Sequence, residues 1–264
     1  PSPKLKRKSG NKKFDVITSI AMFYDVQDPN KFTSEIHDIL DSDGIWVMEM
    51  FYIPILLKYN AYDSICHEHI TYLTYAHIES LCENNNLRIF NATLNSMNCG
   101  SIRYFICHKN AKFKSNYKAI NKCKKYEKNL ERNKIYFDFK KRIKKISKKL
   151  NLLIKSINKK KEIIHIYGAS TKGNVLVQYS KINKKDIPYA AERNPSKWSK
   201  KMPGSNIPII SEKTSRSMKP DYYLVLPWHF KNDFIKREKV FLSNGGKLIF
   251  PLPKIKIFSK KRFK

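Results

Sequence analysis

The sequence lacks the features that mark several common classes of protein. Its five cysteines form no CxxC pair and their number is odd, which argues against both a zinc ribbon and a secreted disulfide framework. No apolar run approaches the roughly 18 residues that a membrane span needs, and the basic start of the chain has no apolar stretch of a signal peptide. We therefore expect a soluble protein of the reduced cytoplasm. Because the chain begins with Pro1 rather than Met, we expect a fragment or a processed product.

Acidic residues are scarce as well. The chain has 53 Lys plus Arg against 22 Asp plus Glu, a net charge of +31, which would attract nucleic acids or anionic membranes. The lysines, however, are spread along the chain among Asn and Ile, whereas nucleic-acid readers gather basic groups on one face with stacking aromatic residues. We interpret the charge as compositional drift with solvated lysine faces, and we expect no specific nucleic-acid partner and no membrane partner.

The first part of the chain alternates between strand and helix patterns. With 264 residues, of which 41% are hydrophobic, the chain can form one large domain or two modest ones. The run that begins at Phe14 predicts a buried strand, and the run Ile45–Met50 predicts a second strand parallel to it, because a helical pattern over 30–40 lies between them. A helix over 75–83 and two strands, 87–94 and 101–108, are predicted to follow.

A second alternation of strands and helices follows a long basic stretch. Apolar residues at spacings of three to five between 126 and 157 predict one long amphipathic helix, which we interpret as a connector between two halves. Strand patterns then start near residues 162, 186, 221 and 247, with helical patterns over 171–182 and 231–242. The alternation predicts an α/β fold with functional loops at the carboxyl ends of the strands.

The segment Cys66-His67-Glu68-His69 is the densest cluster of titratable groups in the chain. Two histidines two residues apart point to one side of an extended segment, so a metal site is one reading, although no convincing third ligand lies nearby. In a second reading, the two histidines have no chemical role and are either exposed or hydrogen-bonded in the core. We favour acid-base chemistry, because His titrates near neutral pH and a neighbouring carboxylate can orient it. Tyr62 and Tyr72 flank the segment as candidate phenol donors.

A small-residue turn, Tyr167 to Asn174, lies where a strand leads into a helix. Free backbone amides, the helix dipole, the Ser170 hydroxyl and Lys172 converge there on a place where a phosphate could bind. The turn is neither a Walker loop nor a GxGxxG motif, and it could instead serve only to pack the helix closely on its strand.

Two further strand ends carry polar groups. Trp228 and His229 end one strand, where we read them as a core Trp capped by a His. Arg193 ends another, where it could pair with an anion or stay solvated.

Nine ordered segments together resemble the sugar C-methyltransferase family of S-adenosylmethionine-dependent enzymes. The resemblance runs from about Phe14 to Ile257 and is carried by FDVITSIAMFYDVQDP, DGIWVMEM, NAYDSICHEHITY, GSIRYF, IYGASTKGN, AERNPSKW, PGSNIPII, KPDYYLVLPWHFK and GGKLIFPLP. It implies a remnant of a Rossmann-like methyltransferase domain over 1–110, a basic helical connector over 111–160 and a C-terminal Rossmann-like α/β domain over 161–264.

The resemblance also implies which parts are missing. Family members resemble one another in having an N-terminal zinc module, and a glycine-rich loop and an acidic strand end that hold S-adenosylmethionine; none of these is in the chain. Zinc would belong only to that missing module, and we expect no metal site in this chain. Of the cofactor site, only Ser19 and Ala21 at the end of the first strand would remain.

What the resemblance implies chemically is methylation at C3 of a nucleotide-linked 4-keto-deoxysugar through an enolate. The family's general base falls on His69, with Glu68 beside it as a positioning or polarising group. Other substrate contacts would come from two groups of residues. Those near the first strand and the CHEH segment are Tyr24, Asp25, Tyr62 and Cys66; those of the second half are Ser170, Lys172, Asn174 and Arg193.

The chain departs from the family at two places. The tyrosine that relatives often carry two positions before the Glu is Cys66 here, and a turn that tends to have two glycines has Cys99 followed by Gly100. Three hypotheses therefore stand: part of a C-methyltransferase, a non-catalytic module that binds a nucleotide sugar or a partner chain, and a non-specific binder of polyanions.

Overall fold

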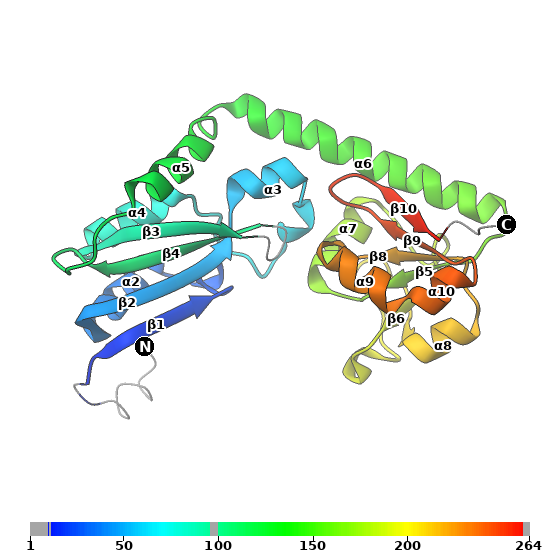
Figure 1. The fold of residues 1–264 in the computed structure, drawn as a ribbon. Coiled ribbons are helices and arrows are strands. Elements are labelled where there is room, and N and C mark those ends of the chain that lie inside the picture. The colour runs from blue at the N-terminus through cyan, green and yellow to red at the C-terminus, as the bar shows by residue number, and fades with distance from the viewer. Residues whose placement is uncertain (1–9, 11, 96–99, 261–264) are drawn as a thin grey trace. The chain divides into compact units, whose positions relative to one another are not determined.

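The computed structural model describes residues 10, 12–95 and 100–260, and the chain divides into two compact units (Figure 1). Unit 1 comprises Pro1–Lys58 and His67–Ile135, and unit 2 comprises Tyr59–Cys66 and Tyr136–Lys264. The chain therefore contributes eight residues to unit 2 before it returns to unit 1 at His67. The predicted position Cys99 lies outside the described residues.

Unit 1 is built on a four-stranded sheet in the order β1-β2-β4-β3. β1 and β2 are parallel, as predicted from the helical pattern between them, whereas β4 is antiparallel to both β2 and β3. The side chains of Trp46, Met48, Met50 and Tyr104 are at most 1% exposed and form the core. The elements of this part of the chain are β1 (Phe14–Ile20), η1 (Phe23–Asp25), α2 (Pro29–Ile39), β2 (Leu40–Phe51), α3 (Ile53–Tyr59), α4 (Tyr75–Asn84), β3 (Leu87–Asn95), β4 (Ser101–His108) and α5 (Tyr117–Glu127).

The first strand is an edge strand, so the prediction of a buried strand is wrong. Val16 is 60% exposed and Ile20 is 51% exposed, and within the described part of the chain β1 pairs only with β2. An uninterrupted apolar run is typical of a strand that is covered on both faces. The run by itself cannot reveal whether a further strand lies alongside.

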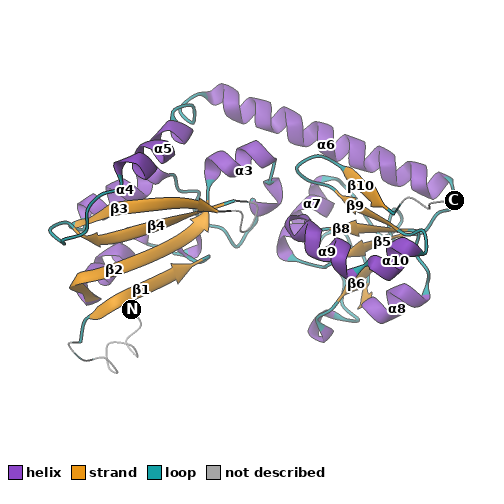
Figure 2. Ribbon diagram, in the orientation of Figure 1, coloured by secondary structure: helices purple, strands orange, loops and turns teal. Residues whose placement is uncertain are grey.

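Unit 2 is built on a six-stranded sheet in the order β10-β9-β8-β5-β6-β7, in which only β10 is antiparallel (Figure 2). The first strand in sequence, β5, lies in the middle of this sheet, and β6 and β7 follow it toward one edge. The chain then returns to β8, beside β5, and β9 and β10 follow toward the other edge, which is the doubly wound arrangement. The elements are η2 (Tyr62–Ser64), α6 (Asn133–Lys159), β5 (Ile164–Tyr167), α7 (Thr171–Tyr179), β6 (Ala190–Glu192), η4 (Pro195–Lys197), β7 (Ile209–Ser211), α8 (Glu212–Ser217), β8 (Tyr222–Val225), η5 (Trp228–Phe230), α9 (Lys231–Arg237), α10 (Lys239–Ser243), β9 (Lys247–Phe250) and β10 (Lys256–Ser259).

The expected helical connector is two helices that belong to different units. α5 packs on β3 and α4 in unit 1, whereas α6 belongs to unit 2 from Tyr136 onward. The sequence predicted one helix because Leu130 continues the helical spacing of the apolar residues. Residues 128–132 nevertheless form a turn, which separates α5 from α6. The unit boundaries consequently differ from those expected at residues 110 and 160. No helix in the described ranges combines the length and the apolar character that crossing a membrane would require.

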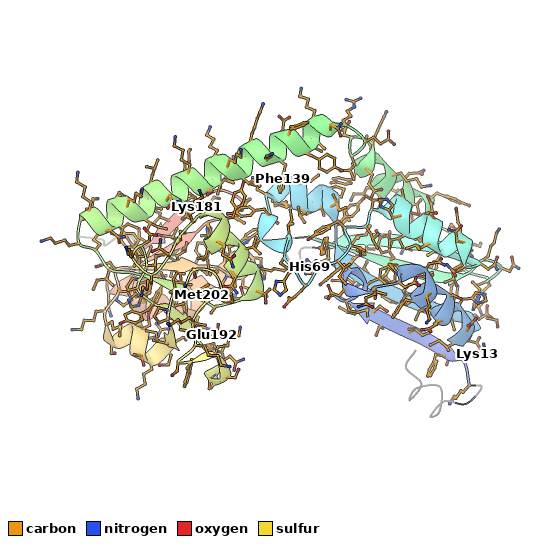
Figure 3. All side chains as sticks on the ribbon, turned by 180° about the vertical axis from the view of Figure 1, so that it is seen from behind. Lys13, His69, Phe139, Lys181, Glu192 and Met202 are labelled. Carbon is orange, nitrogen blue, oxygen red and sulfur yellow. The ribbon has the colours of Figure 1, made fainter. Side chains whose placement is uncertain are left out.

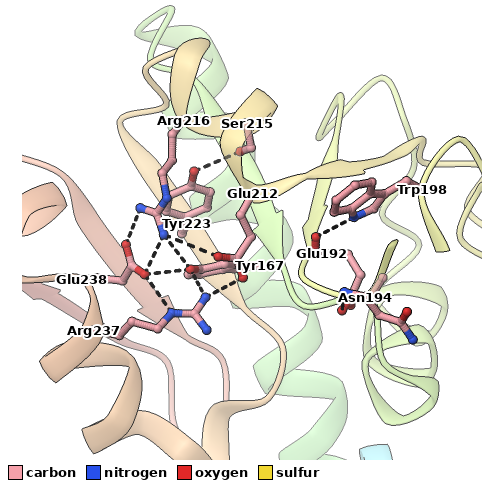
Figure 4. Close-up of polar contacts among 11 residues, drawn as sticks. Tyr167, Glu192, Asn194, Trp198, Glu212, Ser215, Arg216, Tyr223, Arg237 and Glu238 are labelled. Carbon is pink, nitrogen blue, oxygen red and sulfur yellow. Dashed lines mark hydrogen bonds and ion pairs between the residues drawn. The ribbon is translucent and has the colours of Figure 1, made fainter. Parts of the chain in front are cut away.

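A buried carboxylate fastens the helices of one face of unit 2 to the sheet (Figure 4). Glu238 is 1% exposed and accepts hydrogen bonds from the Tyr167 hydroxyl at 2.7 Å, from Arg216 at 2.6 and 2.9 Å, and from Arg237 at 3.2 Å. Although burial raises its pKa, the hydrogen bonds from Arg216 and Tyr167 hold the pKa of Glu238 below its ordinary value. Because both carboxylate oxygens of Glu238 accept hydrogen bonds, we interpret this group as an anchor for α8 and α9.

The same face holds a buried histidine. His165 in β5 is 1% exposed, and its Nδ1 lies 2.9 Å from the Ser215 hydroxyl, which lies 2.9 Å from the Tyr223 hydroxyl. Burial lowers the pKa of His165 to about 4. Between about pH 4 and pH 6.5 the ring is therefore neutral in the folded protein, whereas in the unfolded chain it would be protonated.

This neutral ring makes stability depend on pH. As the pH falls below the ordinary value of 6.5, the unfolded chain binds a proton that folded His165 does not bind until about pH 4, so the free energy of unfolding decreases. We expect His165 to contribute a loss of about 2 kcal/mol between pH 7 and pH 5. Urea denaturation at pH 7 and pH 5 gives this loss in the free energy of unfolding, for the wild type and for His165→Asn. Equal losses in the two proteins would contradict the assignment.

Candidate functional site

The CHEH segment (Cys66–His69) lies on an irregular stretch between η2 and α4, and His69 is the buried one of its two histidines. The His69 side chain is 9% exposed and is labelled in Figure 3. Its ring stacks on Phe51 with 5.0 Å between centroids and lies 4.4 Å from the ring of Tyr24. These two aromatic rings fix the plane of the imidazole.

Backbone hydrogen bonds fasten the residues that follow His69. The amides of Ile70 and Thr71 both donate to the carbonyl of Tyr24 at 3.0 Å. Tyr24 belongs to η1, which follows β1, and Phe51 is the last residue of β2. His69 is therefore held at the carboxyl ends of two parallel strands, which is the edge where α/β sheets bind their ligands.

The other predicted residues of unit 1 differ in accessibility. Glu68 and Asp25 are exposed, whereas Tyr24 is 8% exposed. The Ser19 hydroxyl accepts a hydrogen bond from the Trp46 indole at 3.0 Å, so this hydroxyl is directed into the core. Ala21 is exposed just beyond β1 in a left-handed conformation with φ 53°.

Tyr62 and Cys66 belong to unit 2 and not to the unit that contains His69. Tyr62 is 2% exposed, its ring lies 5.1 Å from that of Tyr179, and burial raises its pKa to about 12. Cys66 is 8% exposed. Nothing in the sequence indicated that Tyr62 and Cys66 belong to a different unit from the adjacent histidines.

In unit 2, the predicted small-residue turn connects β5 to α7. Gly168 has φ 87°, and a Cβ at this position would lie 2.8 Å from Pro227. Ser170 is the N-cap of α7 and accepts from the amide of Gly173 at 3.1 Å. The turn therefore lies close to Pro227, which follows β8.

Side chains already bind two of the amides that we expected to face a phosphate. The amide of Ala169 donates to Glu192 at 2.8 Å, and that of Gly173 donates to Ser170. Glu192 ends β6 and is labelled in Figure 3. Arg193, the next residue, is exposed. The turn thus has fewer free amides for an anion than the sequence suggested. Any binding of an anion at this turn would therefore depend more on the charge of Lys172.

Three polar residues that the sequence analysis did not assign to the site lie at the same edge. Asp63 of η2 is 1% exposed and accepts from Trp228 Nε1 at 2.8 Å, while Nδ1 of His229 is buried and has no hydrogen-bond partner in the described part. Burial raises the pKa of Asp63 to about 6 and lowers that of His229 to about 4. Oδ1 of the predicted residue Asn174 is likewise buried without a partner among residues 10, 12–95 and 100–260. The only signal for Asp63 in the sequence was its place in the polar stretch before the CHEH segment, since its burial is visible only in the structure.

A cavity of about 740 Å³ lies on the other side of this unit, beside α8 and α10. Its lining includes Arg216, Tyr223, Arg237, Glu238 and Phe241. The two arginines bind Glu238 and lie within ion-pair distance of Glu212. Both arginines of this cavity are therefore already paired with carboxylates.

The CHEH segment shows no arrangement of metal ligands. Within the described ranges, no group of three or more His, Cys, Asp or Glu side chains is placed to hold a metal ion. The reading of His69 as an acid-base group stays a prediction.

Comparison with known proteins gives matches over most of the chain. Residues 96–253 match the C-methyltransferase C-terminal domain, and residues 3–91 match a methyltransferase domain. C-methyltransferase NovU of Streptomyces niveus is 28% identical over 238 residues, which are 90% of this chain and 57% of NovU. The chain thus spans little more than half the length of this curated relative.

Two solved structures are similar to part of the chain. One is a chain of a complex that contains the Haloferax volcanii Trm112 methyltransferase activator, with 14% identity, a TM-score of 0.31, and coverage of 37% of this chain and 55% of that one. The other is magnesium protoporphyrin IX methyltransferase from Synechocystis PCC 6803, with 10% identity, a TM-score of 0.29, and coverage of 37% and 46%.

The close approach of Gly168 to Pro227 can be tested by substitution. We expect Gly168→Ala to lower the free energy of unfolding by about 1–3 kcal/mol, because the new Cβ adds a clash to an unfavourable φ. Gly10→Ala is the control: Gly10 has φ 56°, and a Cβ at this position would meet no atom of the described residues within 4 Å, so we expect only the backbone part, about 1 kcal/mol. Denaturant unfolding measures both. Equal losses would mean that the Pro227 contact is unimportant.

Proposed function

Because the chain belongs to the C-methyltransferase family, we propose that it forms part of an S-adenosylmethionine-dependent enzyme that methylates C3 of a nucleotide-linked 4-keto-deoxysugar. The family match over residues 96–253 supports the reaction class. The observation that carries the mechanism is the placement of His69 at the carboxyl ends of β1 and β2, between the rings of Tyr24 and Phe51.

In this proposal His69 is the general base. A C–H beside a ketone is the only sugar C–H acidic enough for a side-chain base. An imidazole nitrogen takes this proton, the C–H bond breaks, and the electron pair moves onto the ketone oxygen to give an enolate. S-adenosylmethionine, when bound, would supply a methyl group from its sulfonium to the enolate carbon and would leave as a neutral thioether. Glu68, which is exposed beside the base, positions or polarises the sugar.

The described residues fit only the margin of a site for the methyl donor. The Ser19 hydroxyl is bound to Trp46, so Ser19 would contribute through its backbone, next to Ala21 at the end of β1. We propose that the remaining contacts come from strands and loops outside residues 1–264, together with the zinc module. The open edge of β1, with Val16 and Ile20 exposed, is where such strands would pair.

Unit 2 is proposed to hold the nucleotide of the substrate. Its sheet reverses order between β5 and β8, and Ser170, Lys172 and Asn174 stand in the turn or helix that follows β5. Ligands of doubly wound sheets bind at such a reversal. Arg193, exposed after β6, is a further candidate for the phosphates. A reducing, cytoplasmic location is part of the proposal, since the four cysteines in the described residues are buried free thiols.

Replacing the proposed base should abolish turnover without unfolding the protein. In the complete enzyme we expect His69→Gln to lower kcat for methyl transfer by about 10²–10⁴-fold, the usual contribution of a general base. His67→Gln is the matched control, because His67 is exposed and two residues away, and it should retain activity. Thermal melting verifies that both variants fold. Turnover in His69→Gln close to the wild-type rate would remove His69 from the mechanism.

A non-catalytic module that binds a nucleotide sugar or a partner chain is the second candidate, because the described residues form only the margin of a methyl-donor site. Calorimetry of the 264-residue chain with a nucleotide sugar and, separately, with S-adenosylmethionine distinguishes the two functions. We expect the chain alone to bind the sugar nucleotide and to bind the methyl donor only when the cofactor-binding part is supplied. Failure to gain methyl-donor binding in that complex would favour the module.

A further inference from the structure

The sheet of unit 2 has the strand order of nucleotide-binding domains. Numbered along the chain from β5, its six strands lie in the order 3-2-1-4-5-6. In sheets of this order the turn after the first strand carries the pattern G-x-G-x-x-G, and an acidic residue about 20 positions further on binds the ribose. The corresponding places in unit 2 are the turn after β5 and the end of β6.

The turn after β5 keeps two of the three glycines of this pattern. Gly168 has φ 87°, and a Cβ on Gly173 would lie 2.6 Å from the side chain of Leu226, so both positions need glycine for the turn and for close packing of α7. Ser170 stands where the second glycine allows a pyrophosphate to approach the backbone. Phosphates at this turn therefore need a partner besides the backbone.

Lys197 of η4 provides a fixed cation at this turn. Its Nζ donates to the carbonyl of Ala169 at 2.8 Å, and the side chain is half-buried. A lysine ammonium has three N–H donors, so it can hold this carbonyl and still bind phosphate oxygens. Because the hydrogen bond to Ala169 orders the side chain before a ligand arrives, less entropy is lost on binding.

Glu192 stands where the pattern has its acidic residue, at the end of β6. Its Oε2 accepts from the amide of Ala169 at 2.8 Å, and its Oε1 accepts from the amide of Asn194 at 3.0 Å. These two hydrogen bonds fix the orientation of the carboxylate. Each carboxylate oxygen can accept more than one hydrogen bond, and the side chain is half-buried, so Glu192 can also accept from a ribose hydroxyl.

A cavity of about 420 Å³ lies beside Glu192, along the edge strand β7. Glu192 pairs with Ser211 of β7 in the sheet, and Ser211 and Trp198 both line the cavity. Trp198 Nε1 donates to the carbonyl of Glu192 at 2.8 Å, which holds the indole next to the carboxylate (Figure 4). Trp198 is 39% exposed, and an accessible indole is a surface on which a base can stack.

We propose that these residues form the site of a ribonucleoside diphosphate: Lys197 binds the phosphates, Glu192 accepts a hydrogen bond from the ribose 2′-hydroxyl, and the base stacks on Trp198 in the cavity along β7. The inference deepens the proposed function and depends on unit 2 holding the nucleotide of the substrate. It adds that this nucleotide contains ribose and not deoxyribose.

Paired nucleotides test the role of Glu192. ADP, CDP, GDP and UDP, each compared with its 2′-deoxy counterpart, are titrated into the 264-residue chain by calorimetry at physiological ionic strength, where surface charge is screened. We expect the ribonucleotide that binds most tightly to lose about tenfold in affinity without its 2′-hydroxyl, because that hydroxyl donates to a charged acceptor. Equal affinities within each pair would overturn the inference and leave the proposed function standing. Binding of none of these nucleotides would contradict both.

Glu192→Ala separates the hydrogen bond from simple electrostatics. The substitution removes a negative charge, so electrostatics alone predicts tighter binding of both members of a pair. The inference predicts weaker binding of the ribonucleotide and a ratio of the two affinities close to one. Asp233→Ala is the matched control: it removes the same charge from an exposed position in unit 2 and should keep the wild-type ratio. A wild-type ratio in a folded Glu192→Ala variant would contradict the inference, and the paired titration of the wild type tests it even if this variant does not fold.

Pyrophosphate, which has neither ribose nor base, tests the other two contacts. We expect Lys197→Met to weaken pyrophosphate binding about tenfold, whereas Lys184→Met, which removes an exposed lysine of the same unit, should not. We expect Trp198→Leu to leave pyrophosphate binding unchanged and to weaken both members of a nucleotide pair by a common factor of about ten. Unchanged pyrophosphate binding in Lys197→Met would overturn the phosphate contact, and unchanged nucleotide binding in Trp198→Leu would overturn the base contact.

Discussion

Parallel strands joined by crossovers end at the same edge of their sheet, and this constraint places the main candidate groups of the protein. In unit 1, Phe51 ends β2 and η1 follows β1, and these two elements hold the ring of His69. In unit 2, the turn after β5 and Trp228 after β8 supply Lys172 and the anchor of Asp63. The strands supply rigidity, whereas the loops at their carboxyl ends supply the reactive groups.

Two buried carboxylates of unit 2 illustrate how a structural group differs from a functional candidate. Glu238 and Asp63 are both 1% exposed. Glu238 receives hydrogen bonds from two arginines and a tyrosine, and its pKa is lowered. Among the described side chains, the Trp228 indole donates to Asp63, and burial raises the pKa of Asp63 to about 6. A fully paired charge anchors elements, whereas an incompletely paired one is more typical of sites that bind or react.

Local patterns predicted the elements that local interactions determine. The helix α2 starts where Asp28 caps it and Pro29 occupies its first turn, and the parallel pairing of β1 with β2 follows from the helix between them. The site was predictable as far as its motif, the CHEH segment. The Asp63–Trp228 contact was not, because it joins residues 165 positions apart, and neither periodicity nor spacing carries information over that distance. The division of the chain at Cys66 was hidden for the same reason.

The large positive charge bears on selectivity rather than on fold. The buried stripe of α6, which includes Ile143, Leu150 and Ile154, faces the core, whereas its lysines are exposed, as expected of solvated faces. Several of the 22 acidic residues are paired inside, among them Glu49 with Arg103 and Glu238 with Arg216, so the surface is strongly cationic. Salt screens such surface charge within roughly 8 Å at physiological ionic strength. Charges held inside a protein are screened far less than surface charges, so the exposed lysines of this chain supply general attraction for anions, whereas selectivity among anions requires fixed, partly buried groups.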